Sequence, residues 1–252
     1  MAQVSTVTSQ AGAVIRDDVA MRFLFVGDSM TIGSAGDFTW RYRMWQHLEA
    51  TLGADGYAIT GPRTELYDIA ANAPHSCAYG DPAFPADARR HLAGWGEGWL
   101  HMAPVIGDTV TATRADVLLV SLGLIDLGFY TDSDQTALNV REFIAAARAA
   151  NPNIKMVLLP VIPNIRAESD ATFAAECDRF NLLIGKAVAD LDNPSSPILL
   201  ASHPEGYDIH TDTYDGTHPG PTGEHRLAGA FADAMHQAWG VGGPYAGALA
   251  SA

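Results

Sequence analysis

The residue whose position best suits it to do chemistry is Ser29, which follows the first apolar run of the chain, Met21–Val26. A serine hydroxyl is a poor nucleophile until a base takes its proton. That base is best supplied by a histidine that a carboxylate holds in the right tautomer. Among nine histidines, His218 stands out because Asp215 precedes it by three residues in a loop rich in turn formers. We therefore take Ser29, His218 and Asp215 as candidates for nucleophile, base and orienting carboxylate.

Two short motifs around these residues resemble those of the SGNH or GDSL hydrolases, over the stretch from Met21 to about Met235. The family's Gly-Asp-Ser-Leu block corresponds to Gly27-Asp28-Ser29-Met30, with methionine in place of leucine. Its Asp-x-x-His block corresponds to Asp215-Gly216-Thr217-His218. The resemblance implies that Ser29 is the nucleophile, His218 the general acid and base, and Asp215 the orienting carboxylate. The Gly-x-Ser-x-Gly motif of α/β-hydrolases does not occur at the matching place, so that family fits less well.

Acyl transfer also needs hydrogen-bond donors for the oxyanion of the tetrahedral intermediate. In the family that this chain resembles, these donors are the nucleophile's own amide, a glycine amide and the Asn side chain of a Gly-x-Asn-Asp block. The resemblance assigns the first two donors to Ser29 and Gly96, with Gly94 as the close alternative for the glycine.

The third block departs from the family, because it reads Gly123-Leu124-Ile125-Asp126. Ile125 occupies the position of the asparagine and cannot donate a hydrogen bond. The loss of one donor raises the barrier by about 3 kcal/mol if nothing replaces it. Asn72 and Asn164 are two candidates for an amide supplied from elsewhere.

The long segment Leu66–Gly98 is rich in Gly, Pro and Ala and carries several aromatic residues, Trp95 among them. A connection of this length is usually functional rather than passive. We predict that Trp95 contacts the substrate, together with Ile125 and Asp126 of the third block.

Short apolar runs that alternate with longer amphipathic stretches are typical of parallel strands and crossover helices. They predict a three-layer α/β/α sandwich with a mainly parallel, flavodoxin-like five-stranded sheet, whose ligands gather at the carboxyl ends of the strands. The expected strands are Met21–Val26, Tyr57–Ile59, Val117–Leu122, Met156–Ile162 and Ile198–Ala201. The expected helices are Phe38–Leu52, Trp99–Thr111, Asp134–Ala150, Ala174–Leu191 and Gly223–Trp239.

The predicted organisation is one SGNH hydrolase domain, residues 21–239, between an N-terminal tail of residues 1–20 and a C-terminal tail of residues 240–252. The 29 acidic residues against 15 Lys and Arg give a net charge of −14, which argues against binding to nucleic acid or to anionic lipid. Neither a basic start followed by an apolar run nor a stretch of about 18 apolar residues occurs, so we expect a cytoplasmic protein without a membrane segment.

We predict that the protein uses no cofactor and no metal. The histidines lack the spacing of metal ligands, and the glycine motifs that bind the phosphates of nucleotide cofactors are absent. The two cysteines, Cys77 and Cys177, lie too far apart in sequence for a zinc knuckle, and we expect reduced thiols.

The expected partner is a small-molecule ester or acyl compound, hydrolysed through a Ser29 acyl-enzyme. Two alternatives remain open at this point. One is a biosynthetic acyltransferase, in which an alcohol or amine intercepts the same intermediate. The other is a pseudoenzyme that binds an acyl or glycan ligand; Ile125 favours it, whereas Ser29, Asp215 and His218 speak against it.

Overall fold

A computed structural model describes residues 20–247 of the chain. Its central sheet has the order β2-β1-β6-β7-β8, and every pair of neighbours along this path is parallel. This is the flavodoxin-like order expected from the sequence, and the three-layer α/β/α class is confirmed. A sixth, very short strand, β5, was not expected; it pairs with the end of β1 at Val26 and Gly27. The strands are β1 Met21–Gly27, β2 Tyr57–Thr60, β5 Leu92–Ala93, β6 Val117–Ser121, β7 Lys155–Leu158 and β8 Ile198–Leu200.

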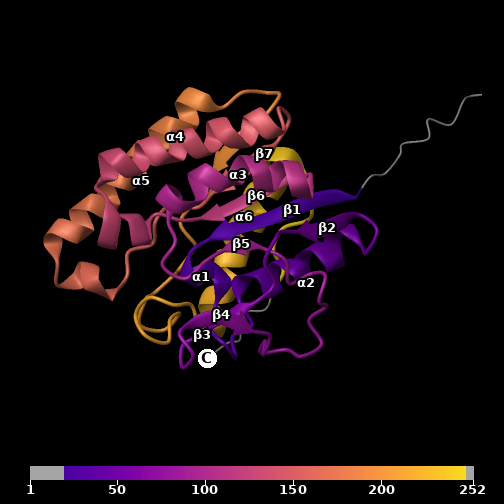
Figure 1. Cartoon of the computed structure of the whole chain (residues 1–252), viewed down its shortest axis with the longest axis horizontal. Helices are drawn as coiled ribbons and strands as arrows, with labels where there is room; N and C mark the ends of the chain where they lie inside the picture. The colour runs from indigo at the N-terminus through magenta and orange to yellow at the C-terminus, as the bar shows by residue number, and fades with distance from the viewer. Residues whose placement is uncertain (1–19, 248–252) are drawn as a thin grey trace, which may run out of the picture.

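Helices cover both faces of the sheet (Figure 1). On one face α3, α4 and α5 contact one another in turn, and on the other face α2 contacts α6. The central strands are therefore buried on both sides, which is why they read as continuous apolar runs rather than alternating ones; residues Phe23 to Val26 of β1 are all fully buried. The helices are α2 Trp40–Leu52, α3 Trp99–Thr113, α4 Ser133–Ala150, α5 Ala171–Leu191 and α6 Pro221–Trp239.

The predicted helix starts were displaced by up to three residues, and α4 shows why. It begins at Ser133, not at Asp134, because the carboxylate of Asp132 accepts a hydrogen bond from the Gln135 amide and caps the helix. Asp134 lies in the first turn and pairs with Arg179 of α5.

The long segment before α3 contains structure that the sequence did not predict. It holds an antiparallel hairpin of β3 Leu66–Asp68 and β4 Ala73–Ser76 as well as β5. Tyr67 of β3 bonds through its backbone to Gly33 and Ala35, which fixes the hairpin beside the end of α1 Ser29–Ile32. Two further short helical turns, η1 Asp126–Tyr130 and η2 Ile165–Glu168, follow β6 and β7.

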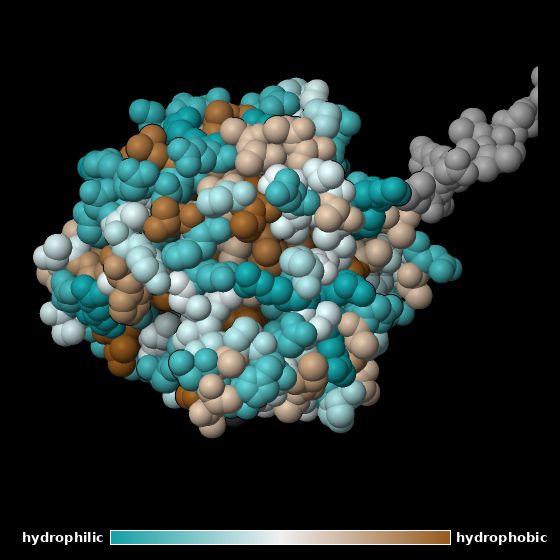
Figure 2. Space-filling model, viewed as in Figure 1, coloured by the Kyte–Doolittle hydropathy of each residue, from teal (hydrophilic) through white to brown (hydrophobic). Residues whose placement is uncertain are grey.

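Most of the two predicted tails, residues 1–19 and 248–252, lies outside the described residues. Residues 240–247 return along α6, where the Tyr245 amide donates to Asp233 and the Tyr245 hydroxyl lies 2.7 Å from His225 Nδ1. On the face shown in Figure 2, apolar residues occur as separate spots among polar ones. Among residues 20–247, none of the helices combines the length and apolar character that crossing a bilayer requires.

Candidate active site

The predicted chemical residues come together at the carboxyl edge of the sheet. Ser29 follows β1, Gly96 follows β5, Ile125 follows β6, and His218 lies on the loop between β8 and α6. Parallel strands all end at this edge, so side chains that are far apart in sequence meet there.

Ser29 is held by the short helix α1, in which it is the first residue. Asp28 caps this helix by accepting the Met30 amide at 3.0 Å. A glycine is required at position 27, because a Cβ there would collide with the Thr31 side chain and the Ser121 carbonyl. Ser29 thus lies in a tight strand-to-helix turn, and it is only 4% exposed.

The other end of α1 is held by Arg41. Arg41 is fully buried, and its guanidinium donates to the carbonyls of Thr31, Ile32 and Arg89. Its donors are used within the fold, so we assign it to the support of α1.

Ser29, His218 and Asp215 form a continuous chain of hydrogen bonds. His218 Nε2 lies 3.0 Å from Ser29 Oγ, and His218 Nδ1 lies 2.7 Å from Asp215 Oδ2. Since a carboxylate can only accept, Nδ1 carries the proton and Nε2 is left to accept from the serine hydroxyl. Burial opposes the charge of Asp215, but the backbone and ring N–H groups of His218 outweigh it and lower the pKa of this carboxyl. It therefore stays ionised and can stabilise an imidazolium.

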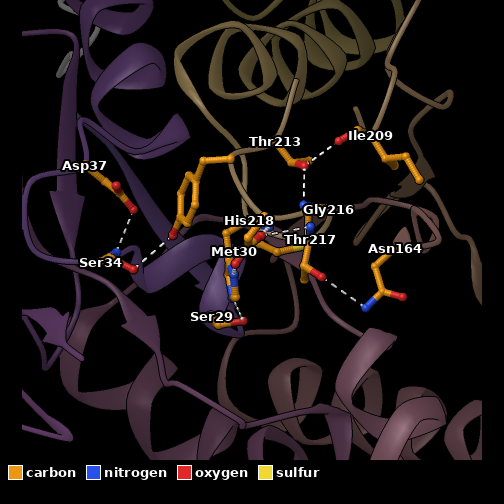
Figure 3. A network of polar contacts seen from close by, with 12 residues as sticks. Ser29, Met30, Ser34, Asp37, Asn164, Ile209, Thr213, Gly216, Thr217 and His218 are labelled. Carbon is orange, nitrogen blue, oxygen red and sulfur yellow. Dashed lines mark hydrogen bonds and ion pairs between the residues drawn. The ribbon is translucent and has the colours of Figure 1, made fainter. Parts of the chain in front are cut away.

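The loop that carries His218 is fixed by its own turn bonds (Figure 3). Asp215 Oδ1 accepts from the amides of Thr217 and His218, at 3.0 and 2.8 Å. The Gly216 amide donates to Thr213 Oγ1 at 2.8 Å, and the Thr213 hydroxyl donates in turn to the Ile209 carbonyl. One aspartate thus both orients the imidazole and shapes the turn that presents it.

The backbone distinguishes the two glycines proposed for the oxyanion hole. The Gly94 amide donates to the Gly27 carbonyl at 3.2 Å, so it is already used. Gly96 has a φ of +73°, and within residues 20–247 neither its amide nor that of Ser29 has a protein acceptor. The Gly96 carbonyl accepts from the Tyr130 hydroxyl at 3.3 Å, which helps to hold this peptide.

The two asparagines suggested as replacements for the missing donor make other contacts. Asn72, at the end of the hairpin turn, is exposed and accepts from the Tyr67 hydroxyl. Asn164 caps η2 and donates to Thr217 Oγ1 at 3.1 Å (Figure 3), so it supports the histidine loop. Ile125 itself is half-buried at the start of η1.

Asp126, for which we predicted a substrate contact, lies buried at the start of α3. It is fully buried, and its two oxygens accept from the amides of Trp99 and Leu100, at 2.8 and 3.1 Å. Its carboxylate caps α3, and Gly98 is required beside it because a Cβ would collide with this carboxylate. Asp126 therefore fixes the start of α3 at Trp99, three residues after Gly96.

Trp95 lies against protein rings. Its indole stacks on the His218 imidazole, with ring centroids 4.7 Å apart and planes 19° apart. Tyr67 stacks on Trp95 at 4.5 Å, and Tyr214 stacks on His218 at 5.8 Å. Tyr67 and Tyr214 were missed by sequence reasoning; for Tyr214, its place directly before Asp215 was the one available signal.

Two further carboxyl groups border the site. Burial raises the pKa of Asp28 to about 7, against the opposing effect of the Met30 amide, and the charge of Asp126 raises it further. Burial also raises the pKa of Asp37, whose carboxylate accepts from the Ser34 amide at 2.7 Å.

A groove of about 800 Å³ lies elsewhere. It is lined by residues of β8, α6, the segment between them and the segment after α6, and it includes none of the residues assigned to the site above. A cavity of about 10 Å³ is lined by Asp28, Met30 and residues at the carboxyl ends of β6 and β7. Within residues 20–247, no three His, Cys, Asp or Glu side chains converge as metal ligands would.

Comparisons with known proteins agree with this architecture. A Talaromyces cellulolyticus protein of carbohydrate esterase family 3 is 23% identical and has a TM-score of 0.69, with 86% of this chain and 97% of that chain covered. A Clostridium thermocellum family 3 carbohydrate esterase is 18% identical, with coverages of 86% and 96% and a TM-score of 0.67. A mutant acetyl esterase solved with acetate ion is 23% identical, with coverages of 86% and 97% and a TM-score of 0.69.

The search of curated protein sequences gives no match. At these identities the solved structures establish a common fold, whereas the family is established from the sequence itself. The sequence model of the GDSL-like lipase/acylhydrolase family matches residues 25–226, from within β1 to within α6. The chain therefore belongs to the GDSL-like lipase/acylhydrolase family and is an esterase-type enzyme.

Proposed function

We propose that this enzyme hydrolyses an ester through a covalent Ser29 acyl-enzyme. The observation that carries the proposal is the chain of hydrogen bonds from Ser29 Oγ to His218 Nε2 and from His218 Nδ1 to Asp215, at 3.0 and 2.7 Å. This is the arrangement in which a neutral imidazole takes the hydroxyl proton as the oxygen attacks a carbonyl.

In the first half-reaction, Ser29 Oγ forms a bond to the carbonyl carbon while its proton passes to His218 Nε2. The negative charge that develops on the carbonyl oxygen is stabilised by the amides of Ser29 and Gly96, which have no protein acceptor among the described residues. The tetrahedral intermediate collapses with loss of the alcohol, whose oxygen receives the proton from His218.

In the second half-reaction, water gives a proton to His218 as its oxygen attacks the acyl carbon. The Ser29 oxygen then leaves and takes this proton back, which releases the acid and restores the enzyme. Asp215 remains ionised throughout and stabilises the imidazolium in both steps.

We further propose that the acyl group is short, as in an acetyl ester of a carbohydrate. The cavity beside Asp28 and Met30 has about 10 Å³ of space, which is room for a group the size of one water molecule or one methyl group. Solved proteins with this fold include a mutant acetyl esterase with acetate ion and two carbohydrate esterases of family 3, which is consistent with a small acyl group.

Labelling with a fluorophosphonate probe, which reacts with activated serines, tests the acyl-enzyme. We expect the native protein to be labelled and Ser29→Ala not to be labelled. The melting temperatures of the two proteins serve to check that both are folded. Labelling of Ser29→Ala at the native rate would refute the assignment.

A series of p-nitrophenyl esters tests the acyl length, and we expect kcat/KM to fall steeply from acetate to octanoate. A flat series would refute the short acyl group. Product analysis with added alcohols separates hydrolysis from acyl transfer, because a transferase yields mainly the new ester.

A further inference from the structure

Four aromatic rings stack in succession across the candidate site, and the imidazole of His218 is one of them. The order is Tyr67, Trp95, His218 and Tyr214, with centroid separations of 4.5, 4.7 and 5.8 Å and interplanar angles of 14°, 19° and 19°. We call Tyr67, Trp95 and Tyr214 the ring stack. Its members come from β3, from the loop after β5 and from the loop before α6.

Both ends of the ring stack contact the segment around Ser34, which ends the turn that begins with Ser29. The Tyr214 hydroxyl lies 3.0 Å from Ser34 Oγ. At the other end of the stack, the Tyr67 backbone bonds to Gly33 and Ala35, on either side of Ser34. The segment that carries the nucleophile therefore anchors both ends of the stack that contacts the base.

Trp95 is held in the stack by its own backbone neighbours. The Gly94 amide is bonded to the Gly27 carbonyl at the end of β1. Beyond Trp95, the Gly96 carbonyl accepts from the Tyr130 hydroxyl. The indole is thus fixed relative to the strand that ends at Ser29.

We propose that Trp95 and Tyr214 are positioning residues, which hold the plane of the His218 imidazole at Ser29, and that Trp95 is not a platform for the substrate. The inference rests on the proposed Ser29 acyl-enzyme. It replaces the substrate contact that the sequence predicted for Trp95, because the rings that stack on this indole are both protein rings.

The physical need for such residues follows from the hydrogen bonds of His218. Its two bonds, to Asp215 and Ser29, act at opposite sides of the ring and leave rotation about the line between them weakly restrained. Stacked rings restrain that rotation, and they exclude water from the ring face. The aromatic faces also stabilise the positive charge that His218 acquires during reaction. A misplacement of about 1 Å in such a site is enough to reduce the rate about 100-fold.

The experiment compares Trp95→Ala, Trp95→Phe and Tyr214→Phe with the native enzyme on p-nitrophenyl acetate. For Trp95→Ala we expect kcat to fall about 10- to 100-fold with KM within twofold, and labelling by the fluorophosphonate to slow by the same factor. Trp95→Phe retains a stacked ring, so we expect it to recover most of kcat. Tyr214→Phe keeps the ring but loses the bond to Ser34, and we expect a fall of about two- to fivefold.

The matched control is Trp239→Ala, which removes another half-buried indole, at the end of α6 beneath the Lys155 ammonium. Its kcat and labelling rate should remain native. A raised KM with native kcat in Trp95→Ala, growing with the size of the ester, would overturn the inference in favour of a substrate platform. The inference would also be overturned if Trp95→Ala kept the native kcat and KM, or if kcat fell as far in Trp95→Phe as in Trp95→Ala. If Ser29→Ala is labelled like the native protein, the proposed function fails and the inference falls with it.

Discussion

Replacement of Asp28 by asparagine should make the protein more stable at neutral and alkaline pH. Asp28 is 2% exposed, and burial raises the pKa of its carboxyl from 3.8 to about 7. The folded protein therefore binds this proton more tightly than the unfolded chain does. The resulting contribution to stability is full below about pH 4, is lost progressively as the pH rises to about 7, and does not change further above that.

The size of the effect follows from the shift of about 3 pKa units, at about 1.36 kcal/mol per unit. As the pH rises, this one group should decrease the free energy of unfolding of the native protein by at most about 4 kcal/mol in total. About 2–3 kcal/mol of this decrease should occur between pH 5 and pH 8. Asn at position 28 has no proton to lose and keeps a side-chain oxygen that can accept from the Met30 amide, the bond that caps α1.

Urea unfolding at pH 5, 6, 7 and 8 measures the difference between Asp28→Asn and the native protein. We expect the unfolding free energy of the variant, relative to that of the native protein, to increase from pH 5 to about pH 7 and to level off by pH 8. A matched control is Asp170→Asn, which also removes a capping carboxylate. The bond from the Phe173 amide lowers the pKa of Asp170, so this carboxyl is ionised in both the folded and the unfolded protein from pH 5 to pH 8, and the difference in unfolding free energy between this variant and the native protein should stay constant over that range. Parallel stability curves for Asp28→Asn and the native protein would refute the reasoning, because Asp28 would then take up no proton on folding.

Three further predictions concern catalysis and its support. Steady-state hydrolysis of p-nitrophenyl acetate should fall about 10⁶-fold in His218→Ala and about 10⁴-fold in Asp215→Asn, since the carboxylate only orients and stabilises the imidazolium; a native rate in His218→Ala would show that another group is the base. Ile125→Asn adds a donor, so kcat/KM should rise about tenfold while the melting temperature falls; a fall in kcat/KM at an unchanged melting temperature would mean that Ile125 does not face the oxyanion. Asp126→Ala removes the acceptor of two helix amides, so the free energy of unfolding should fall by about 1–2 kcal/mol in urea titrations and the labelling of Ser29 should slow, with Asp126→Asn intermediate in both. A native labelling rate in Asp126→Ala would show that this helix cap does not influence the site.

The sequence alone determined the class of the fold and identified the residues of the candidate site. The five main strands lie within a few residues of the predicted apolar runs, because a parallel strand covered on both faces leaves an unbroken apolar signature. The helix starts were displaced by up to three residues, since a cap such as Asp132 depends on one local hydrogen bond rather than on periodicity. Ser29, Asp215 and His218 were identifiable because their chemistry demands particular residue types in short motifs.

Only the tertiary structure decided how the other residues around this chemistry are used. Ser29 and His218 lie 189 residues apart in sequence, and their 3.0 Å contact depends on parallel strands that end at one edge. Asp126 reads as a polar residue near the site, yet its burial against the start of α3 makes it a helix cap. Trp95 reads as a substrate contact, but it stacks between a hairpin and a loop whose arrangement is set by pairing across the whole chain. The local sequence pattern indicates the backbone conformation of a residue, whereas the neighbours of its side chain are fixed by long-range packing that no short window of sequence contains.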